Sequence, residues 1–114
     1  MIDRETFFPL VFFEYDHKPG TFCLILSDDH MADTEDVFGE FGQYGNGHDW
    51  EDVARSALFA RAPELAGRPG SDLDFDSEAG MFCAYGEDAD VLRLLGRLLQ
   101  EAWRDRAVLR GYIG

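Results

Sequence analysis

The apolar positions of this 114-residue chain change their spacing from one segment to the next, and the spacing predicts its elements. Residues 6–16 (TFFPLVFFEYD) and 21–27 (TFCLILS) are nearly continuous apolar runs joined by HKPG, a turn sequence. Pro9 would interrupt a helix, so the two runs predict a β-hairpin whose first strand is buried on both faces. Alternation in residues 73–76 (LDFD) and the apolar run 81–85 (MFCAY), joined by SEAG, predict a second hairpin.

Helical spacing appears first between the two hairpins. Residues 34–42 (TEDVFGEFG) predict a short helix that Thr34 caps and Gly42 ends. The acidic residues of its first turn lie at the positive end of the helix dipole. Phe38 and Phe41 share one side of this helix, which we expect to face the core.

Two longer helices are predicted by the same kind of spacing. Asp49 is expected to cap the first of them, in which apolar side chains recur from Trp50 to Leu58 at intervals of three and four residues. Asp88 is expected to cap the last helix, whose apolar face extends to Trp103. The opposite side of this last helix carries Arg93, Arg97, Arg104 and Arg106.

The resulting order is ββααββα, with a polar connection at residues 28–32 and a loop at residues 67–72. This order predicts an α+β fold with a small, mainly antiparallel sheet of two hairpins and with helices packed on one face. The length suits a single domain, residues 1–114. No apolar run approaches the length of a membrane span and the first residues lack a secretory signal, so we expect a cytoplasmic protein that does not engage a membrane.

The distribution of charge narrows the choice of partner. The chain has 23 Asp and Glu against 10 Lys and Arg, a net charge of −13. The whole excess lies in residues 1–85, because residues 86–114 contain five acids and five bases. Residues 28–52 contain nine acidic residues and no Lys or Arg. Such a field repels polyanions, which argues against nucleic acid as a partner and favours a basic protein or a cation. The alternative is that the acidity only keeps a small protein soluble, but the clustering of the acids favours a partner.

A glycine-rich stretch before a helix, residues 45–54 (GNGHDWEDVA), raises the question of phosphate binding. Asp49, Glu51 and Asp52 would place three negative charges in the first turn of that helix, where a phosphate needs none. The glycine spacing also matches neither the dinucleotide-binding motif nor the P-loop. We therefore expect Gly45-Asn46-Gly47 to be a tight turn with positive φ at consecutive residues.

Alternating carboxylates near the second hairpin resemble a metal loop but are better explained by a strand. An EF-hand loop counted from Asp72 would need glycine and glutamate at its sixth and twelfth positions, and the chain has neither there. Leu73 and Phe75 instead predict a strand with one buried face and its carboxylates in water. A weaker alternative is a metal-assisted hydrolase that uses Asp72, Asp74, Asp76 and Glu78.

Other residue types with catalytic potential lack the necessary patterns. The three histidines have no metal-ligand spacing, so we expect no metal and no cofactor. Cys23 and Cys83 lie in apolar runs, as buried reduced thiols do, and a disulfide between them stays open. No serine lies in a nucleophile-elbow motif. We therefore expect neither catalysis nor a small-molecule substrate.

Aromatic residues interleave with the acids of residues 28–52, and this mixture favours a protein-binding surface for an Arg/Lys-rich partner. Apolar anchors inside a charged rim are what such a partner requires. The predicted partner-binding residues are Asp36, Glu40, Tyr44, His48, Asp49, Trp50, Glu51 and Asp52. Trp50 and the turn at Gly45–Gly47 can equally serve the core, and the sequence leaves that choice open.

Two segments together resemble the immunity protein 51 family of bacterial polymorphic toxin systems: residues 45–54 (GNGHDWEDVA) and residues 74–88 (DFDSEAGMFCAYGED). The matching positions are Asn46, Gly47, Asp49 and Trp50 in the first segment and Phe75, Asp76, Glu78, Gly80, Met81 and Phe82 in the second. His48 stands where the family pattern would have an aromatic residue such as tyrosine. The resemblance spans nearly the whole chain. It implies a small cytoplasmic α+β protein that binds and neutralises a cognate protein toxin and is not an enzyme.

Three functional hypotheses follow in order of preference. The first is an immunity protein whose residues 28–52 dock on a basic toxin, such as a nuclease. The second is a non-catalytic adaptor or regulatory domain that binds another basic protein. The third is the metal-dependent hydrolase built on the carboxylates of residues 72–78.

Overall fold

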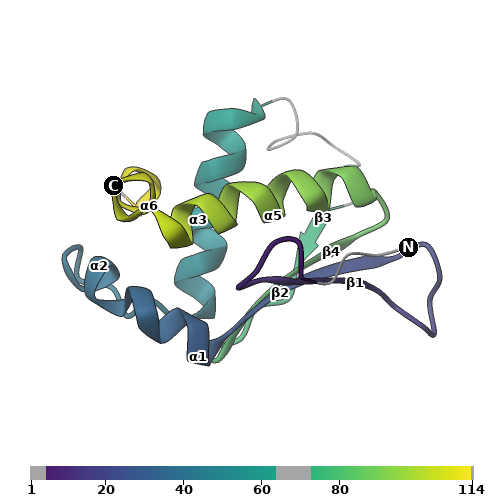
Figure 1. Ribbon diagram of the computed structural model, residues 1–114, viewed down its shortest axis with the longest axis horizontal. Helices are drawn as coiled ribbons and strands as arrows, with labels where there is room; N and C mark the ends of the chain where they lie inside the picture. The colour runs from purple at the N-terminus through teal and green to yellow at the C-terminus, as the bar shows by residue number, and fades with distance from the viewer. Residues whose placement is uncertain (1–4, 64–72, 114) are drawn as a thin grey trace.

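Four antiparallel strands form one sheet in a computed structural model that describes residues 5–63 and 73–113 (Figure 1). The strands are β1 (Val11–Glu14), β2 (Phe22–Ser27), β3 (Leu73–Phe75) and β4 (Met81–Gly86). They pair in the order β1-β2-β4-β3, so each predicted hairpin is confirmed and the two hairpins meet where β2 pairs with β4.

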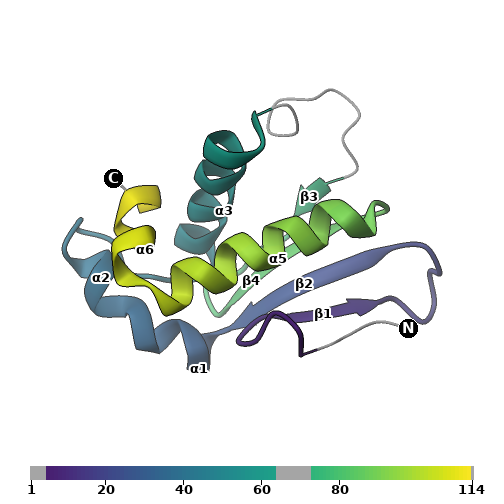
Figure 2. The same ribbon diagram turned by 45° about the horizontal axis from the view of Figure 1, so that its top comes forward.

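The helices lie on one face of this sheet, as Figures 1 and 2 show. They are α1 (Asp28–Met31), a 3-10 turn η1 (Ala32–Thr34), α2 (Glu35–Gly39), α3 (Gly47–Arg61), α5 (Ala89–Arg104) and α6 (Arg106–Ile113). Helix α5 runs along the central strands, and α3 crosses both α5 and β4. The α+β class with helices on one face is therefore confirmed.

The core forms where the strands turn alternate residues towards α5. Leu24 and Leu26 of β2 and Phe82 and Ala84 of β4 are buried beneath the helices. Helix α5 contributes Leu92, Leu95, Leu98, Leu99 and Ala102. These are the apolar positions of the last helix that the periodicity predicts.

The first predicted strand is much shorter than residues 6–16. Backbone hydrogen bonds from Phe8 to Glu5 and from Leu10 to Phe7 form turns there, and the strand begins only at Val11. Phe7 is buried because its ring lies against Gly96 of α5, where a Cβ would approach the ring to 2.8 Å. The part of the apolar run before Val11 thus packs against α5 and does not extend the strand. The helices described here cover β1 on one face, not on both as predicted.

Two helical boundaries also differ from the prediction. The predicted polar connection at residues 28–32 is helix α1 and the beginning of η1, and Met31 enters the core. The single last helix is in fact α5 and α6, which separate at Asp105. The Asp105 carboxylate accepts hydrogen bonds from the backbone N–H groups of Ala107 and Val108 and so starts a new helix. The predicted loop at residues 67–72 lies outside the described residues.

Helix α2 is shorter than predicted, and its two phenylalanines separate. Thr34 precedes α2 without a side-chain capping bond, because its hydroxyl donates to the carbonyl of Met31. The helix ends at Gly39, and Gly42 lies in the following turn with φ of 77°. Phe38 is buried as predicted, but Phe41 is 42% exposed, so its predicted place in the core is wrong.

The start of α3 rests on the turn of the second hairpin. Glu78 and Met81 exchange backbone hydrogen bonds of 2.8 and 3.1 Å and close this turn. Gly47 lies directly against it, donating its N–H to the carbonyl of Ala79 at 3.1 Å. A Cβ on Gly47 would overlap the carbonyl oxygens of Glu78 and Met81, so the close approach requires glycine.

We expect Gly47→Ala to lower the free energy of unfolding by about 1–3 kcal/mol, because the added methyl group must push α3 away from the hairpin. Gly111→Ala is the matched control: it lies in α6 with open space around its Cβ, so it should be neutral or stabilising by up to about 1 kcal/mol. Urea unfolding of both variants tests the difference, and a Gly47→Ala protein as stable as the wild type would refute the contact.

Candidate partner-binding site

The N-cap of α3 is Asn46, three residues before the predicted Asp49. The Asn46 side-chain oxygen accepts a hydrogen bond of 3.0 Å from the backbone N–H of Asp49. Asn46 has the extended backbone of a cap, and its φ of −85° is not positive. Within the predicted turn, Gly45 alone has a positive φ, so the expectation of consecutive positive φ values is wrong.

Asp49 fixes the loop that precedes its own helix. Its Oδ2 accepts hydrogen bonds from the backbone N–H groups of Tyr44 at 3.0 Å and of Gly45 at 2.8 Å. The Asn46 side chain thus caps the helix at Asp49, while the Asp49 side chain satisfies two backbone N–H groups of the loop that precedes Asn46. The amides of Gly45 and Gly47, two of those that an anion could have used, are bonded to Asp49 and to Ala79.

The aromatic residues of the candidate site divide between surface and core. Tyr44, whose backbone N–H is bonded to the Asp49 carboxylate, has a side chain that is 82% exposed. Phe41 in the same loop is also exposed. Trp50 is 0% exposed and packs against Phe38 with ring centroids 5.6 Å apart. The indole of Trp50 thus supports the loop from beneath, while the phenol of Tyr44 faces solvent.

Residues 28–52 occupy one end of the molecule, opposite the turn between β1 and β2 (Figures 1 and 2). Seven of the nine carboxylates in this segment are exposed: Asp28, Asp29, Asp33, Glu35, Asp36, Glu40 and Asp52. Helix α2 lies close to the loop, because a Cβ on Gly45 would lie 3.3 Å from the Cα of Glu35. Exposed His48 and Asp52 continue the surface onto α3, whereas Glu51 is half-buried and pairs with Arg55 at 3.2 Å.

Two of the predicted site residues hold α6 in place. Arg106 donates hydrogen bonds of 2.8 and 2.9 Å to the Asp36 carboxylate, and Arg110 donates two of 3.0 Å to Glu40. These hydrogen bonds lower the pKa of both carboxyl groups from ordinary values of 3.8 and 4.5. One signal in the sequence could have indicated this pairing. Asp36 and Glu40 are four residues apart, and so are Arg106 and Arg110, so each pair lies on one side of a helical segment.

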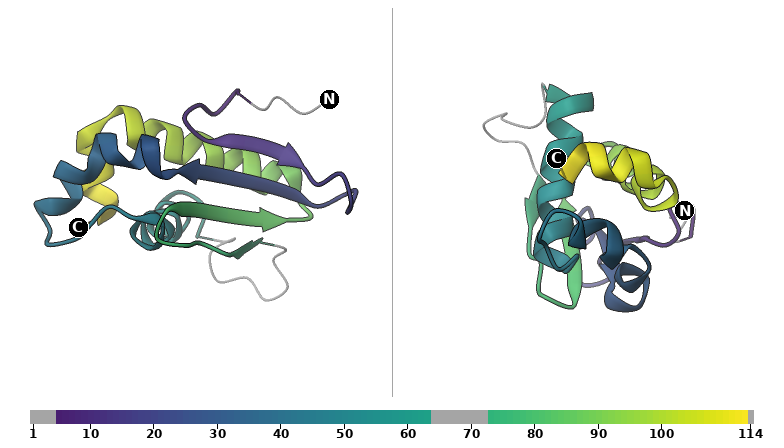
Figure 3. Two further views of the ribbon diagram at one scale, coloured as in Figure 1. Left: turned by 90° about the horizontal axis from the view of Figure 1, so that it is seen from below. Right: turned by 90° about the vertical axis from the view of Figure 1, so that its left-hand side faces the viewer.

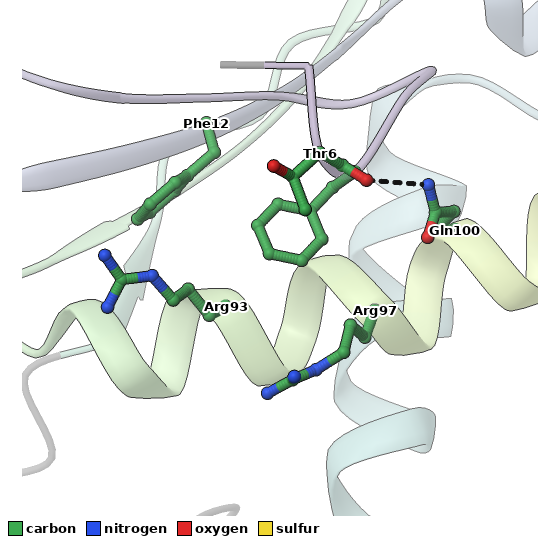
Figure 4. A pocket seen from close by; sticks show the side chains of 6 residues that line it. Thr6, Phe12, Arg93, Arg97 and Gln100 are labelled. Atoms are coloured by element: carbon green, nitrogen blue, oxygen red, sulfur yellow. Dashed lines mark hydrogen bonds between the residues drawn. The ribbon is translucent and has the colours of Figure 1, made fainter. Parts of the chain in front are cut away.

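Positive charge gathers instead on the outer side of α5. Arg93 and Arg97 line a pocket of about 320 Å³ between α5 and the segment that precedes β1. Figure 4 shows Arg93 beneath the ring of Phe12, at 5.4 Å from its centroid, and Gln100 donating to the carbonyl of Thr6 at 3.0 Å. This side of the molecule is therefore unsuited to a basic partner.

The two cysteines are free thiols on neighbouring strands. Both are buried, and their sulfur atoms lie 3.5 Å apart in hydrogen-bond contact. This contact lowers the pKa of Cys23 and raises that of Cys83. The disulfide that the sequence left open is absent from this structure.

The carboxylates of the hydrolase hypothesis are arranged as a strand predicts. Asp74 and Asp76 are exposed while Leu73 and Phe75 pack against the core, and Asp72 lies outside the described residues. Within residues 5–63 and 73–113, no three His, Cys, Asp or Glu side chains are grouped so that they could hold a metal ion. No helix in those ranges is long and apolar enough to cross a bilayer.

Comparison with known protein families assigns the chain to a family. The family model described as Immunity protein 51 matches residues 10–114, which is nearly the full length. The chain belongs to the immunity protein 51 family. A search of curated proteins and a search of solved structures returned no match.

Membership of the immunity protein 51 family makes this chain an immunity protein with a cognate toxin as its partner. The fold also explains why two separate segments carry the family resemblance. Residues 45–54 contain Gly47, and residues 74–88 contain the Glu78–Met81 turn on which Gly47 rests. The two segments thus form one structural unit, the junction between α3 and the second hairpin.

We predict that acid weakens the attachment of α6. Because the pKa values of Asp36 and Glu40 are lower in the folded protein, their contribution is complete above the unfolded-state values and is lost as pH falls through the folded-state values. Asp36→Asn combined with Glu40→Gln should therefore be less stable than the wild type at neutral pH, and this difference should shrink in acid. Thermal unfolding between neutral and acidic pH measures it.

Asp90→Asn is the control for this prediction, since it removes a carboxylate from an ion pair within α5 and leaves the α2–α6 contact intact. A double variant whose stability is the same as that of the wild type throughout the pH range would show that the ion pairs do not hold α6.

Proposed function

We propose that this immunity protein neutralises a basic toxin by docking on what we call the α2–α3 surface. It comprises the exposed side chains of Asp36, Glu40, Phe41, Tyr44, His48 and Asp52. Of the other predicted site residues, Asp49 fixes the backbone at Tyr44 and Trp50 is buried in the core, while half-buried Glu51 pairs with Arg55 on the same helix. A toxin that acts on nucleic acid would carry the required positive charge.

The exposure of Tyr44 is the observation that carries the proposal. A large side chain that is 82% exposed buries much apolar area when a partner covers it. Its backbone is already fixed by the Asp49 carboxylate, so binding orders little additional chain. Asp49 bonds its backbone, and exposed Glu40 and Asp52 belong to the same segment of the chain. An aromatic anchor with a polar or charged rim is the usual composition of a strong protein interface.

The ion pairs of α6 refine the electrostatic part. Asp36 and Glu40 are matched by Arg106 and Arg110, so their charges are partly neutralised before a toxin arrives. Glu35, Asp52 and Asp33 have exposed carboxylates with no ion pair to another described residue, and these supply most of the uncompensated charge. Long-range attraction of a basic toxin towards this end then follows from net charge and its placement.

Tyr44→Ala should weaken binding of the cognate toxin domain by about 2 kcal/mol or more, because it removes the exposed anchor. Phe59→Ala is the matched control: Phe59 is a 72% exposed aromatic residue near the other end of α3. Calorimetric Kd values and survival of cells that express the toxin measure the effect. Equal affinity for Tyr44→Ala and the wild type would place the interface elsewhere.

The association rate constant should fall steeply as ionic strength rises, because salt screens the attraction of a basic toxin. Asp52→Lys should lower this rate constant at low salt and flatten its salt dependence. Asp16→Lys makes the same charge change at the opposite end of the sheet and should have a smaller effect. Stopped-flow mixing tests both variants, and a wild-type rate constant indifferent to salt would rule out electrostatic steering.

A further inference from the structure

The sheet has a second apolar face, turned away from the helices. Strand register places Phe13, Cys23 and Tyr85 in one cross-strand row, and Val11, Ile25 and Cys83 in the next. Met81 lies opposite Ser27 at the end of the sheet. A sheet with one solvated face normally alternates apolar and polar residues, whereas these strands are apolar on both faces.

Among the described residues, no helix covers this face. Figure 3, left, shows the molecule from below, with the strands in front of α5 and with α1 and α2 beside the end of β2. The main core contains Phe12, Leu24 and Phe82 from the helix-facing side, and none of the side chains of the two outer rows. Val11, Ile25, Met81 and Tyr85 stay partly accessible, whereas Cys23 and Cys83 in the same rows are buried.

The rim of this face carries negative charge. Asp74 stands opposite Tyr85 on the edge strand β3, and Asp76 follows it along the same edge; both are exposed. At the other end of β4, the Asp28 carboxylate lies near Gly80 of the hairpin turn. Lys18 shares one corner with Asp74 and Tyr85. An apolar centre with a mainly acidic rim is complementary to an apolar patch surrounded by Lys and Arg.

We propose that the open face of the sheet is a second part of the toxin interface, continuous with the α2–α3 surface. The proposal rests on the function proposed above. The two surfaces meet at the junction of Gly47 with Met81, because Gly47 begins α3 and Met81 begins the open face. A toxin that covers Tyr44 and His48 can therefore extend past Met81 onto Ile25 and Tyr85 without crossing a helix.

The charge of the chain argues against a second copy as the occupant. Two copies joined through this face would bring together two molecules of net charge −13. The acidic rims at Asp74 and Asp76 would then lie within one interface, and like charges in an interface oppose association. A basic toxin instead gains from both the rim and the apolar centre.

Hydroxyl-radical footprinting of the wild-type protein tests the proposal without any substitution. The probe is the toxin domain that co-purifies with this protein, at a concentration that saturates the immunity protein. We expect the toxin to slow oxidation of Met81 and Tyr85 several-fold, together with Tyr44, and to leave Phe59 unchanged. Protection of Tyr44 without Met81 and Tyr85 would overturn the sheet proposal and leave the α2–α3 surface intact. Protection of the sheet residues without Tyr44 would instead overturn the proposed α2–α3 site.

Tyr85→Lys provides the complementary test, because it places a positive charge in the open face of the sheet. Toxin affinity should fall about tenfold or more, while Phe59→Lys, an equal change on α3, should have little effect. Circular dichroism first establishes whether both variants are folded. If the Tyr85→Lys variant is not folded, the footprinting of the wild type alone decides the proposal. A free protein that is dimeric by light scattering and becomes monomeric with Tyr85→Lys would identify the face as a self-association surface and overturn the proposal.

Discussion

The contact of Gly47 with the Glu78–Met81 turn is the constraint on which the rest of the structure depends. It fixes the first turn of α3 against the sheet, and the position of that turn decides which neighbours face inward. Trp50 then packs in the core beside Phe38, and the loop before α3 carries Tyr44 with its side chain exposed to solvent. A side chain at position 47 would separate the helix from the hairpin, so the chemistry of one residue sets the shape of the candidate site.

The acidic residues of this protein can either form bonds inside the fold or present negative charge to a partner. Asp49 and Asp105 satisfy backbone amides and start or orient chain segments, while Asp36 and Glu40 bind the arginines of α6. Each internal use removes negative charge from what a partner can meet. Net charge alone therefore overstates the negative potential at the α2–α3 surface. The carboxylates of Glu35 and Asp52, which form no ion pair with another described residue, contribute most to that potential.

Hydrophobic periodicity predicts most of the fold because strands and helices bury their faces in regular patterns. It places both hairpins and the core of α5 correctly. The errors arise where spatial neighbours decide: the run before Val11 packs on α5, and Asn46 takes the cap because Asp49 bonds backward to Tyr44. The site divides in the same way, since composition indicates an acidic and aromatic surface, but only packing distinguishes buried Trp50 from exposed Tyr44.

An apolar face with an acidic rim reconciles two requirements of a toxin-neutralising protein. Charge accelerates the encounter but contributes little lasting stability in water, because exposed pairs are screened and pay for desolvation. Apolar burial contributes stability but does not steer, and by itself it would favour self-association. On this molecule the rim carboxylates of Asp74 and Asp76 border the rows that contain Ile25 and Tyr85, so like-charge repulsion disfavours pairing of two copies, while the basic toxin that we propose would gain from both charge and apolar burial.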